Sequence, residues 1–205
     1  MQDLTLIILA GGKNTRMKQE KAFLMIEDQR LIDKMVEEGK KYFKEIIVVT
    51  NEIEKYRYLD AIVISDLIPR QGPLAGIHAG LTKSSFKYSF VIACDMPFAS
   101  MKLGAMLVKN LENEDVVVPE ISGGFQPLQA IYGKSCLPVI EQHLKQGRRK
   151  TTEIFDELNV KVVTEEQLKK WGCNSMIFIN VNTPQEFNDA IRMAKSYRDV
   201  AKNNC

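Results

Sequence analysis

Residues 5–25 read TLIILAGGKNTRMKQEKAFLM, an apolar segment followed by two glycines and a basic stretch. Residues 5–9 are continuously apolar after Thr5 and rich in branched side chains, which is typical of a strand buried on both faces of a parallel sheet. Gly11 and Gly12 can adopt positive φ and let a ligand approach the backbone amides. Four cations surround this turn, namely Lys13, Arg16, Lys18 and Lys21. The stretch therefore predicts a site for the phosphates of a nucleoside triphosphate.

Two better-known phosphate loops are excluded by their spelling. The dinucleotide-binding loop requires G-x-G-x-x-G and the P-loop requires G-x-x-x-x-G-K-[ST], and residues 11–21 fit neither pattern. The plain alternative is an ordinary glycine turn surrounded by solvated lysines. A buried strand leading directly into two glycines, an arginine and a lysine favours the phosphate site.

Length and charge limit the function classes that remain. A chain of 205 residues with 45% hydrophobic content is long enough for one substantial core, so we expect a single domain over residues 1–205. The 28 basic and 26 acidic residues leave a net charge of +2, which argues against a nucleic-acid partner held by a general basic field. Anion binding is therefore expected to be local.

The cysteines and the amino-terminal segment indicate a cytoplasmic protein. The four cysteines are widely scattered without a C-x-x-C pair or a zinc spacing, so we expect reduced thiols. The apolar part of MQDLTLIILAGG is too short to span a bilayer and lacks both a basic leader and a cleavage region. It is interpreted as the first strand, and no membrane partner is expected.

Residues 1–119 alternate between apolar runs and segments with helical periodicity. We expect strands at 46–49, 61–65, 90–94 and 116–119, and helices at 31–43, 74–83 and 101–111. Such alternation predicts an α/β fold with a doubly wound, mostly parallel sheet between two helical layers, a three-layer α/β/α arrangement. Gly76 and Gly80 lie one helical turn apart, which predicts a bare helix face for close packing.

Polar residues follow three of these strands. Asn51 comes after 46–49, Asp66 after 61–65 and Asp95 after 90–94. The carboxyl ends of parallel strands form the usual ligand edge, so Asp95 is placed to hold magnesium against bound phosphates. The alternatives are helix capping by Asn51 of the segment starting at Glu52, and a turn or cap by Asp95 before Pro97.

The second half departs from this alternation. We expect a turn at 121–124, an edge strand at 126–132 entered through Pro127, a helix at 136–146 and a last apolar strand at 176–179. Thr183, Pro184 and Glu186 predict the start of a final helix with a capping box, which continues through Ala194. Residues 198–205 are interpreted as a frayed polar tail.

Two polar clusters in this half are candidate contacts for a second substrate. Arg148 and Arg149 follow Gly147 at the end of the helix, where they either clamp a phosphate or complement the helix terminus. Asn180 and Asn182 alternate across Val181 and either donate from one face to an anion or pterin, or serve as turn residues.

Taken together, these residues resemble the molybdenum cofactor guanylyltransferase family. The resemblance rests on LAGGKNTRM with Lys21, Asp66, GPLAG, CDMP, QPLQAIY, GRR and NVNTP, which occur in family order along nearly the whole chain. LAGG with an arginine and a lysine is shared by many nucleotidyltransferases, whereas its combination with CDMP and NVNTP is much narrower. The family has a Rossmann-like nucleotidyltransferase fold, which agrees with the α/β pattern above.

The resemblance implies transfer of GMP from GTP to molybdopterin carrying molybdenum, with Mg²⁺ as cofactor. It implies a GTP-binding half at about residues 1–119 and a molybdopterin-binding half at about 120–197. Molybdoenzyme apoproteins and cofactor-insertion chaperones are further candidate partners. The GTP-binding positions it implies are Leu9, Ala10, Gly11, Gly12, Lys21, Asn51, Asp66 and Asp95, with Asp95 as the metal ligand. Arg16, Lys21 and Asp95 resemble catalytic positions, and the molybdopterin positions are Arg148 or Arg149, Asn180 and Asn182.

Two positions depart from the family pattern. Lys18 stands where the family usually has glycine, and Glu20 stands where aspartate is usual. Other readings also stay open: use of CTP or of another phosphorylated acceptor, a non-catalytic nucleotide-binding regulator, or an adaptor that delivers the cofactor.

Overall fold

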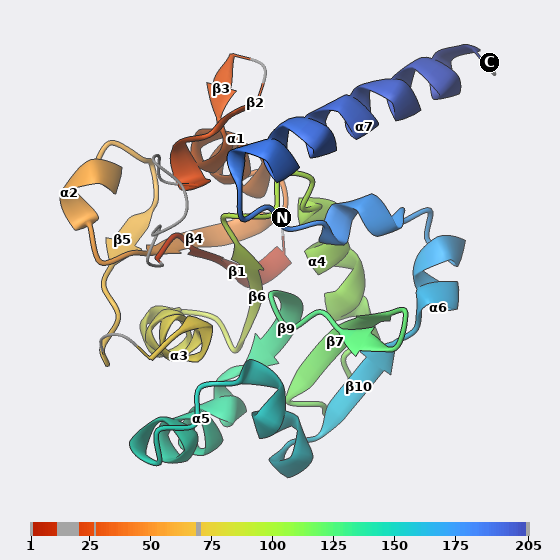
Figure 1. Cartoon of the computed structure of the whole chain (residues 1–205). Helices are drawn as coiled ribbons and strands as arrows, with labels where there is room; N and C mark the ends of the chain where they lie inside the picture. Colours follow the sequence, from red (N-terminus) through yellow and green to blue (C-terminus); the bar gives the residue numbers. More distant parts are fainter. Residues whose placement is uncertain (1, 12–20, 27, 69–70, 204–205) are drawn as a thin grey trace.

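The computed structural model describes residues 2–11, 21–26, 28–68 and 71–203 (Figure 1). The strands are β1 (Gln2–Leu9), β2 (Met25–Ile26), β3 (Gln29–Arg30), β4 (Phe43–Val49), β5 (Ile62–Ile64), β6 (Tyr88–Ala93), β7 (Val116–Ile121), β8 (Gly124–Phe125), β9 (Gln129–Gly133) and β10 (Val160–Val163). The α-helices are α1 (Leu31–Gly39), α2 (Ile53–Tyr56), α3 (Pro73–Lys83), α4 (Met101–Leu107), α5 (Leu137–Lys145), α6 (Glu165–Lys170) and α7 (Pro184–Asn203). The 3₁₀ segments are η1 (Lys21–Phe23), η2 (Val108–Asn110), η3 (Lys134–Cys136), η4 (Thr151–Glu157) and η5 (Ser175–Phe178).

The main sheet has the order β10-β7-β9-β6-β1-β4-β5, with β8 paired to β7. Strands β6, β1, β4 and β5 are parallel neighbours, and β10 is parallel to β7. Only β9 on the seven-strand path runs against its two neighbours, β6 and β7. The predicted doubly wound, mostly parallel α/β fold is confirmed.

Helices cover both faces of the sheet, as Figure 1 shows. Alternate residues of β1 face opposite layers: Leu6 and Ile8 join one hydrophobic core, and Ile7 and Leu9 join the other. The first core is closed by α1, α4, α6 and α7, and the second by α3 and α5. This two-sided burial explains why the strand at 5–9 is apolar throughout after Thr5, which itself is fully buried.

Close packing of α3 on β1 depends on its two glycines. A Cβ at Gly80 would lie 2.6 Å from Ile7 Cγ2, and one at Gly76 would lie 2.9 Å from Leu9 Cδ2. The prediction of a bare helix face is confirmed, and this packing brings the first turns of α3 to the carboxyl end of β1.

Three predicted elements differ from the structure. The segment at 126–132 is not an edge strand, because β9 lies between β6 and β7; Pro127 precedes the strand, so its missing N–H removes no ladder bond. The apolar run at 176–179 is mostly the 3₁₀ segment η5, where the Asn174 side chain accepts a 3.0 Å bond from Met176 N. The helix at 31–43 ends at Gly39, and buried Phe43 already begins β4.

Smaller differences concern the helix ends and the region after residue 150. α4 ends at Leu107 and passes into η2, and residues 198–203 continue α7 instead of forming a frayed tail. The helix expected at 136–146 is α5. It ends before Gly147, whose φ is 73°. η4, β10 and α6 were not predicted. The Thr183 cap is confirmed, since its hydroxyl accepts a 3.1 Å bond from Glu186 N, although the Glu186 carboxylate accepts from Asn182 N rather than from Thr183.

Candidate functional site

Four parallel strands end at the same edge of the sheet. Leu9, the last residue of β1, is in register with Val49 on one side and with Ala93 on the other, and Val49 is in register with Ile64. The residues that follow these four therefore emerge side by side. This edge is the usual ligand edge of a doubly wound sheet.

Backbone hydrogen bonds extend this alignment past the strand ends. Ala10 N donates to Val49 O at 2.9 Å, Thr50 N donates to Ile64 O at 2.9 Å, and Cys94 N donates to Leu9 O at 3.0 Å. These bonds bring together the predicted GTP positions Leu9, Ala10, Gly11, Asn51, Asp66 and Asp95.

Gly11 presents bare backbone at this edge. It is exposed, and a Cβ added to it would meet only Val49 O, at 3.9 Å. Its φ is not positive, contrary to the expected reason for glycine here. Packing among the described residues does not demand glycine at this position, and the missing Cβ leaves the backbone open to close approach by a ligand.

Asn51 and Asp66 form a polar pair across the ends of β4 and β5. Asn51 Nδ2 donates to Asp66 Oδ2 at 3.1 Å. Burial raises the pKa of Asp66, and the hydrogen bond from Asn51 opposes that rise. The capping alternative for Asn51 is wrong, because the N-cap of α2 is Glu52. The Glu52 backbone N–H donates to Thr50 Oγ1 at 3.2 Å, not to Asn51.

Asp95 lies at the end of the central strand β6 and contacts the second half of the chain. Its carbonyl accepts a 2.8 Å bond from Val181 N, which brings the exposed Asn180 and Asn182 to the same edge. The N-cap of the next helix, α4, is Ser100, so Asp95 does not cap it. A metal-ligand candidate and a second-substrate candidate thus share one corner of the site.

Arg148 and Arg149 lie on the turn that follows α5. Gly147 N donates to Leu144 O at 3.0 Å and Arg148 N to His143 O at 2.9 Å, which closes the helix. Both arginine side chains are exposed. Their part in the site stays a prediction.

Several predicted residues follow Gly11 in the sequence. Gly12, Lys13, Arg16, Lys18 and Glu20 lie outside the described residues. Lys21 begins η1, whose backbone is described. The next residue, Ala22, is buried, and Phe23 stacks on Tyr56 of α2 with ring centroids 5.1 Å apart. η1 is thereby fixed against α2.

Gln129 was not identified from the sequence. It is the first residue of β9, is fully buried, and lies opposite Ile92 near the end of β6. The reversal of β9 is what places its first residue at this edge. No local sequence signal indicates that β9 runs antiparallel to both of its neighbours. Pro127 suggested an edge strand instead.

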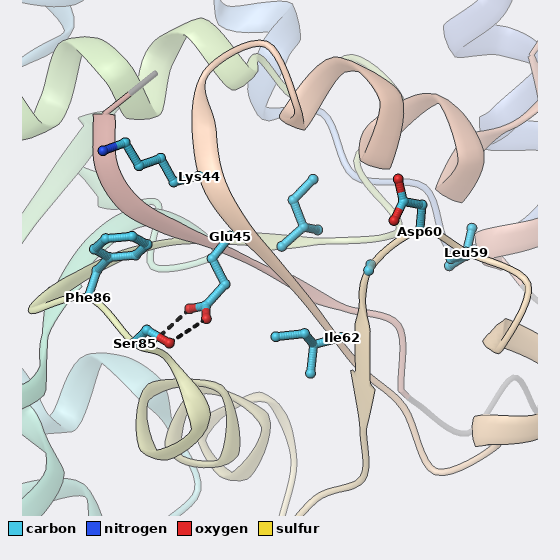
Figure 2. A pocket seen from close by; sticks show the side chains of 9 residues that line it. Lys44, Glu45, Leu59, Asp60, Ile62, Ser85 and Phe86 are labelled. Carbon is cyan, nitrogen blue, oxygen red and sulfur yellow. Dashed lines mark hydrogen bonds between the residues drawn. The ribbon is translucent and has the colours of Figure 1, made fainter.

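A separate hollow lies at the opposite edge of the sheet (Figure 2). Glu45 accepts bonds there from Ser85 N and Ser85 Oγ, at 2.8 and 2.7 Å, and from the buried Thr5 hydroxyl at 2.6 Å. These bonds lower the pKa of Glu45 against the opposing effect of its burial. Glu45 and Ile62 lie near the amino ends of β4 and β5, so this hollow is distinct from the candidate site.

The described residues contain no group of three or more His, Cys, Asp or Glu side chains able to hold a metal ion together. No helix among them has the length and apolarity needed to cross a membrane.

Residues 6–162 match the family model described as the MobA-like NTP transferase domain. The chain is also 36% identical over 200 residues to "Molybdenum cofactor guanylyltransferase" of Desulfosudis oleivorans, covering 97% of this chain and 99% of that protein. The chain belongs to the molybdenum cofactor guanylyltransferase family. A second relative, "Probable molybdenum cofactor guanylyltransferase" of Pelotomaculum thermopropionicum, is 37% identical over 198 residues and covers 97% of each chain.

Solved structures agree with this family. The crystal structure of molybdopterin-guanine dinucleotide biosynthesis protein A from Archaeoglobus fulgidus superposes with a TM-score of 0.81 at 27% identity, covering 94% of this chain and all of that one. 2-C-methyl-D-erythritol 4-phosphate cytidylyltransferase from Thermus thermophilus, at 17% identity and a TM-score of 0.68, shows the shared fold over 95% of this chain and all of that one. This member of the molybdenum cofactor guanylyltransferase family is therefore a nucleotidyltransferase, as the sequence predicted.

Proposed function

We propose that the protein transfers GMP from GTP to the terminal phosphate of molybdopterin carrying molybdenum. The products are the guanine dinucleotide form of the cofactor and pyrophosphate. The observation that carries this proposal is the bond between Asp95 O and Val181 N, since it joins the nucleotide edge of the sheet to the Asn180–Asn182 segment. The names of the relatives supply the substrates.

The nucleotide side is built on the ends of β1, β4 and β5. Leu9 O and Ala10 N take part in sheet bonds, so the guanine is expected to meet the backbone just beyond them, at Ala10 O and Gly11. The Asn51–Asp66 pair supplies a carboxylate that accepts hydrogen bonds from the nucleoside. Arg16 and Lys21, which follow Gly11 in the sequence, are the cations expected to contact the phosphates and the reacting groups.

Asp95, two residues after the end of β6, is suited to bind a magnesium ion. Magnesium commonly binds through one or two carboxylates completed by water and substrate phosphates, and Asp95 supplies a partly buried carboxylate at the phosphate edge. We propose Asp95 as its protein ligand. When bound, magnesium would supply positive charge that neutralises the phosphate oxygens.

The acceptor side combines exposed amides and cations. Asn180 and Asn182 lie beside Asp95, where their side chains can donate hydrogen bonds to the pterin or its phosphate. Arg149, or alternatively Arg148, would orient the attacking phosphate through charge-assisted bonds. This assigns the first 119 residues mainly to GTP and residues 120–197 to molybdopterin.

The chemical step requires no protein nucleophile. An oxygen of the acceptor phosphate forms a bond to the α-phosphorus while the bond from that phosphorus to the bridging oxygen breaks, and pyrophosphate leaves in line. The protein contributes alignment of the two substrates and compensation of charge. The supply of GTP makes the cytoplasm the proposed compartment, with molybdoenzyme apoproteins and insertion chaperones as proposed recipients of the product.

Pyrophosphate release tests the proposal. Purified protein is incubated with magnesium, molybdenum-loaded molybdopterin and GTP, CTP or ATP in separate reactions. We expect release with GTP, dependent on molybdopterin, and formation of the guanine dinucleotide by mass spectrometry. Release with CTP alone would assign the cytosine cofactor instead. Absence of release with every nucleotide, despite measurable nucleotide binding, would favour a regulator or adaptor.

A further inference from the structure

Gln129 connects the turn at Asp95 to the segment that carries the two asparagines. Its side-chain Nε2 donates to the carbonyl of Ile177, in η5, and lies 3.5 Å from the sulfur of Met96. Met96 directly follows Asp95, and Ile177 precedes Asn180 by three residues. One buried amide thus contacts both sides of the corner where the two substrates are proposed to meet.

Several hydrogen bonds hold the asparagine segment, and Gln129 provides one that comes from the sheet interior. Val181 N binds Asp95 O at 2.8 Å, and Asn182 N binds the exposed Glu186 carboxylate at 2.7 Å. Between Ile177 and Asn180, Ile179 N also donates to Met176 O at 3.1 Å, which is a bond internal to the turn. The bond from Gln129 to Ile177 O ties this turn to β9 and thereby restrains the approach of the backbone to Asn180.

The burial of Gln129 is unfavourable for stability. Its exposed fraction is 0%, and the described part of the chain offers its Oε1 no hydrogen-bond partner. A buried amide with an unsatisfied oxygen is costly relative to an apolar side chain of the same shape. Gln129 lies opposite Ile92 of β6 and is buried in the core. Methionine or leucine at this position would be more stable. The amide at this position is thus explained by its contacts with Met96 and Ile177.

We propose that Gln129 is a positioning residue for the acceptor substrate. It fixes Asn180 and Asn182 relative to Asp95 through its contacts with Ile177 and Met96, without touching a substrate itself. This inference rests on the proposed function, because it assigns the asparagines to the acceptor. Reactant misplacement of about 1 Å can lower a rate about 100-fold, so a side chain of this kind has a large effect on turnover.

The test compares Gln129→Met with the wild type. Methionine preserves length and apolar volume but removes the donor to Ile177 O. We expect kcat/KM for molybdopterin to fall about 10- to 100-fold, while the Kd for GTP measured by calorimetry changes less than about 3-fold. The melting temperature is expected to stay within about 4 °C of the wild type. Hydrogen exchange should accelerate in residues 177–182 and not in the ends of β1 and β4.

Ser89→Ala is the matched control. Ser89 is a second fully buried polar residue of the β6–β9 pair, opposite Tyr132 and further from the candidate site. Its loss should leave the kinetics of both substrates unchanged. Should Gln129→Met not fold, Gln129→Leu removes the same donor and is measured in the same way.

The outcomes separate this inference from the proposed function. Wild-type kcat/KM for molybdopterin in Gln129→Met would overturn it, and so would equal losses for both substrates accompanied by a large fall in melting temperature. If the wild-type protein itself transfers no GMP, the proposed function fails. Hydrogen exchange then decides about Gln129 alone, with unchanged exchange in residues 177–182 overturning its positioning role.

Discussion

Asn51 donates a 3.1 Å hydrogen bond to Asp66 across the carboxyl ends of two neighbouring parallel strands. The two residues are 15 positions apart in the sequence and meet because β4 and β5 are in register from Ile47 to Val49. The amide holds a carboxylate whose ionised form is disfavoured by burial. This pair therefore exchanges some stability for a hydrogen-bond acceptor at the nucleotide edge.

Replacement of that carboxylate should separate stability from binding. Burial raises the pKa of Asp66. The stability contributed by its protonated carboxyl group is therefore present below the unfolded pKa and is lost as the pH rises through the folded pKa. We expect Asp66→Asn to melt at a higher temperature than the wild type at pH 7, with the difference shrinking toward about pH 4. Affinity for GTP should fall about 10- to 100-fold by calorimetry. Asp60→Asn, at an exposed acid in the segment that precedes β5, is the control.

Asp95 should be essential for turnover but not for folding. We expect Asp95→Asn to lower kcat for pyrophosphate release by at least about 100-fold, because loss of a metal ligand removes several kcal/mol of charge stabilisation. The circular dichroism spectrum should be that of the wild type. Activity is measured across a magnesium titration, and wild-type turnover at any magnesium concentration in this series would remove Asp95 from the metal site.

The two arginines after α5 can be distinguished by single substitutions. Arg149→Ala should raise KM for molybdopterin about 10-fold or more, since a charge-assisted hydrogen bond to the acceptor phosphate is lost. Arg148→Ala should have the smaller effect, and the reverse order would exchange their roles. Both side chains are exposed, so melting temperatures should not change. Lys145→Ala, at an exposed cation on α5, controls for general charge loss.

The packing of α3 against β1 should be sensitive to a single methyl group. A Cβ at Gly80 would lie 2.6 Å from Ile7 Cγ2, so Gly80→Ala should lower the free energy of unfolding by about 1 to 3 kcal/mol in urea denaturation. At Gly124 an added Cβ would meet its nearest atom, Ile121 O, at 3.6 Å. Gly124→Ala should therefore change the free energy of unfolding by less than about 0.5 kcal/mol. Equal effects at the two positions would contradict the close contact.

Local sequence pattern was sufficient to predict the parallel strands within residues 1–119 and the polar residues that follow them. Strands at 46–49 and 90–94 are apolar on both faces, and parallel strands must end at a common edge, so Asn51, Asp66 and Asp95 could be grouped before the structure was known. The position of Gly11 in the site followed from the same rule, although its φ did not.

The second half depended on pairings that no local pattern specifies. A short apolar run such as 176–179 is compatible with a strand or with part of a helix, and the Asn174 cap decides for η5. The direction of β9 is set by its pairing with β6 and β7, which lie far from each other in the chain. Gln129 was missed for this reason, since its role depends on which end of β9 faces the site.

The reversal of β9 also places the connection between β7 and β9 at the ligand edge. The chain leaves β7 at the ligand edge, forms the short β8 hairpin, and returns through β9 starting from that edge. Residues 122–128, which include β8, therefore connect β7 to β9 at the ligand edge, and both ends of this connection are fixed in the sheet. Insertions or deletions in that connection would reshape the acceptor side while the strands that present Gly11, Asn51 and Asp66 keep their register. A fold of this design can acquire a new acceptor without rebuilding its nucleotide site.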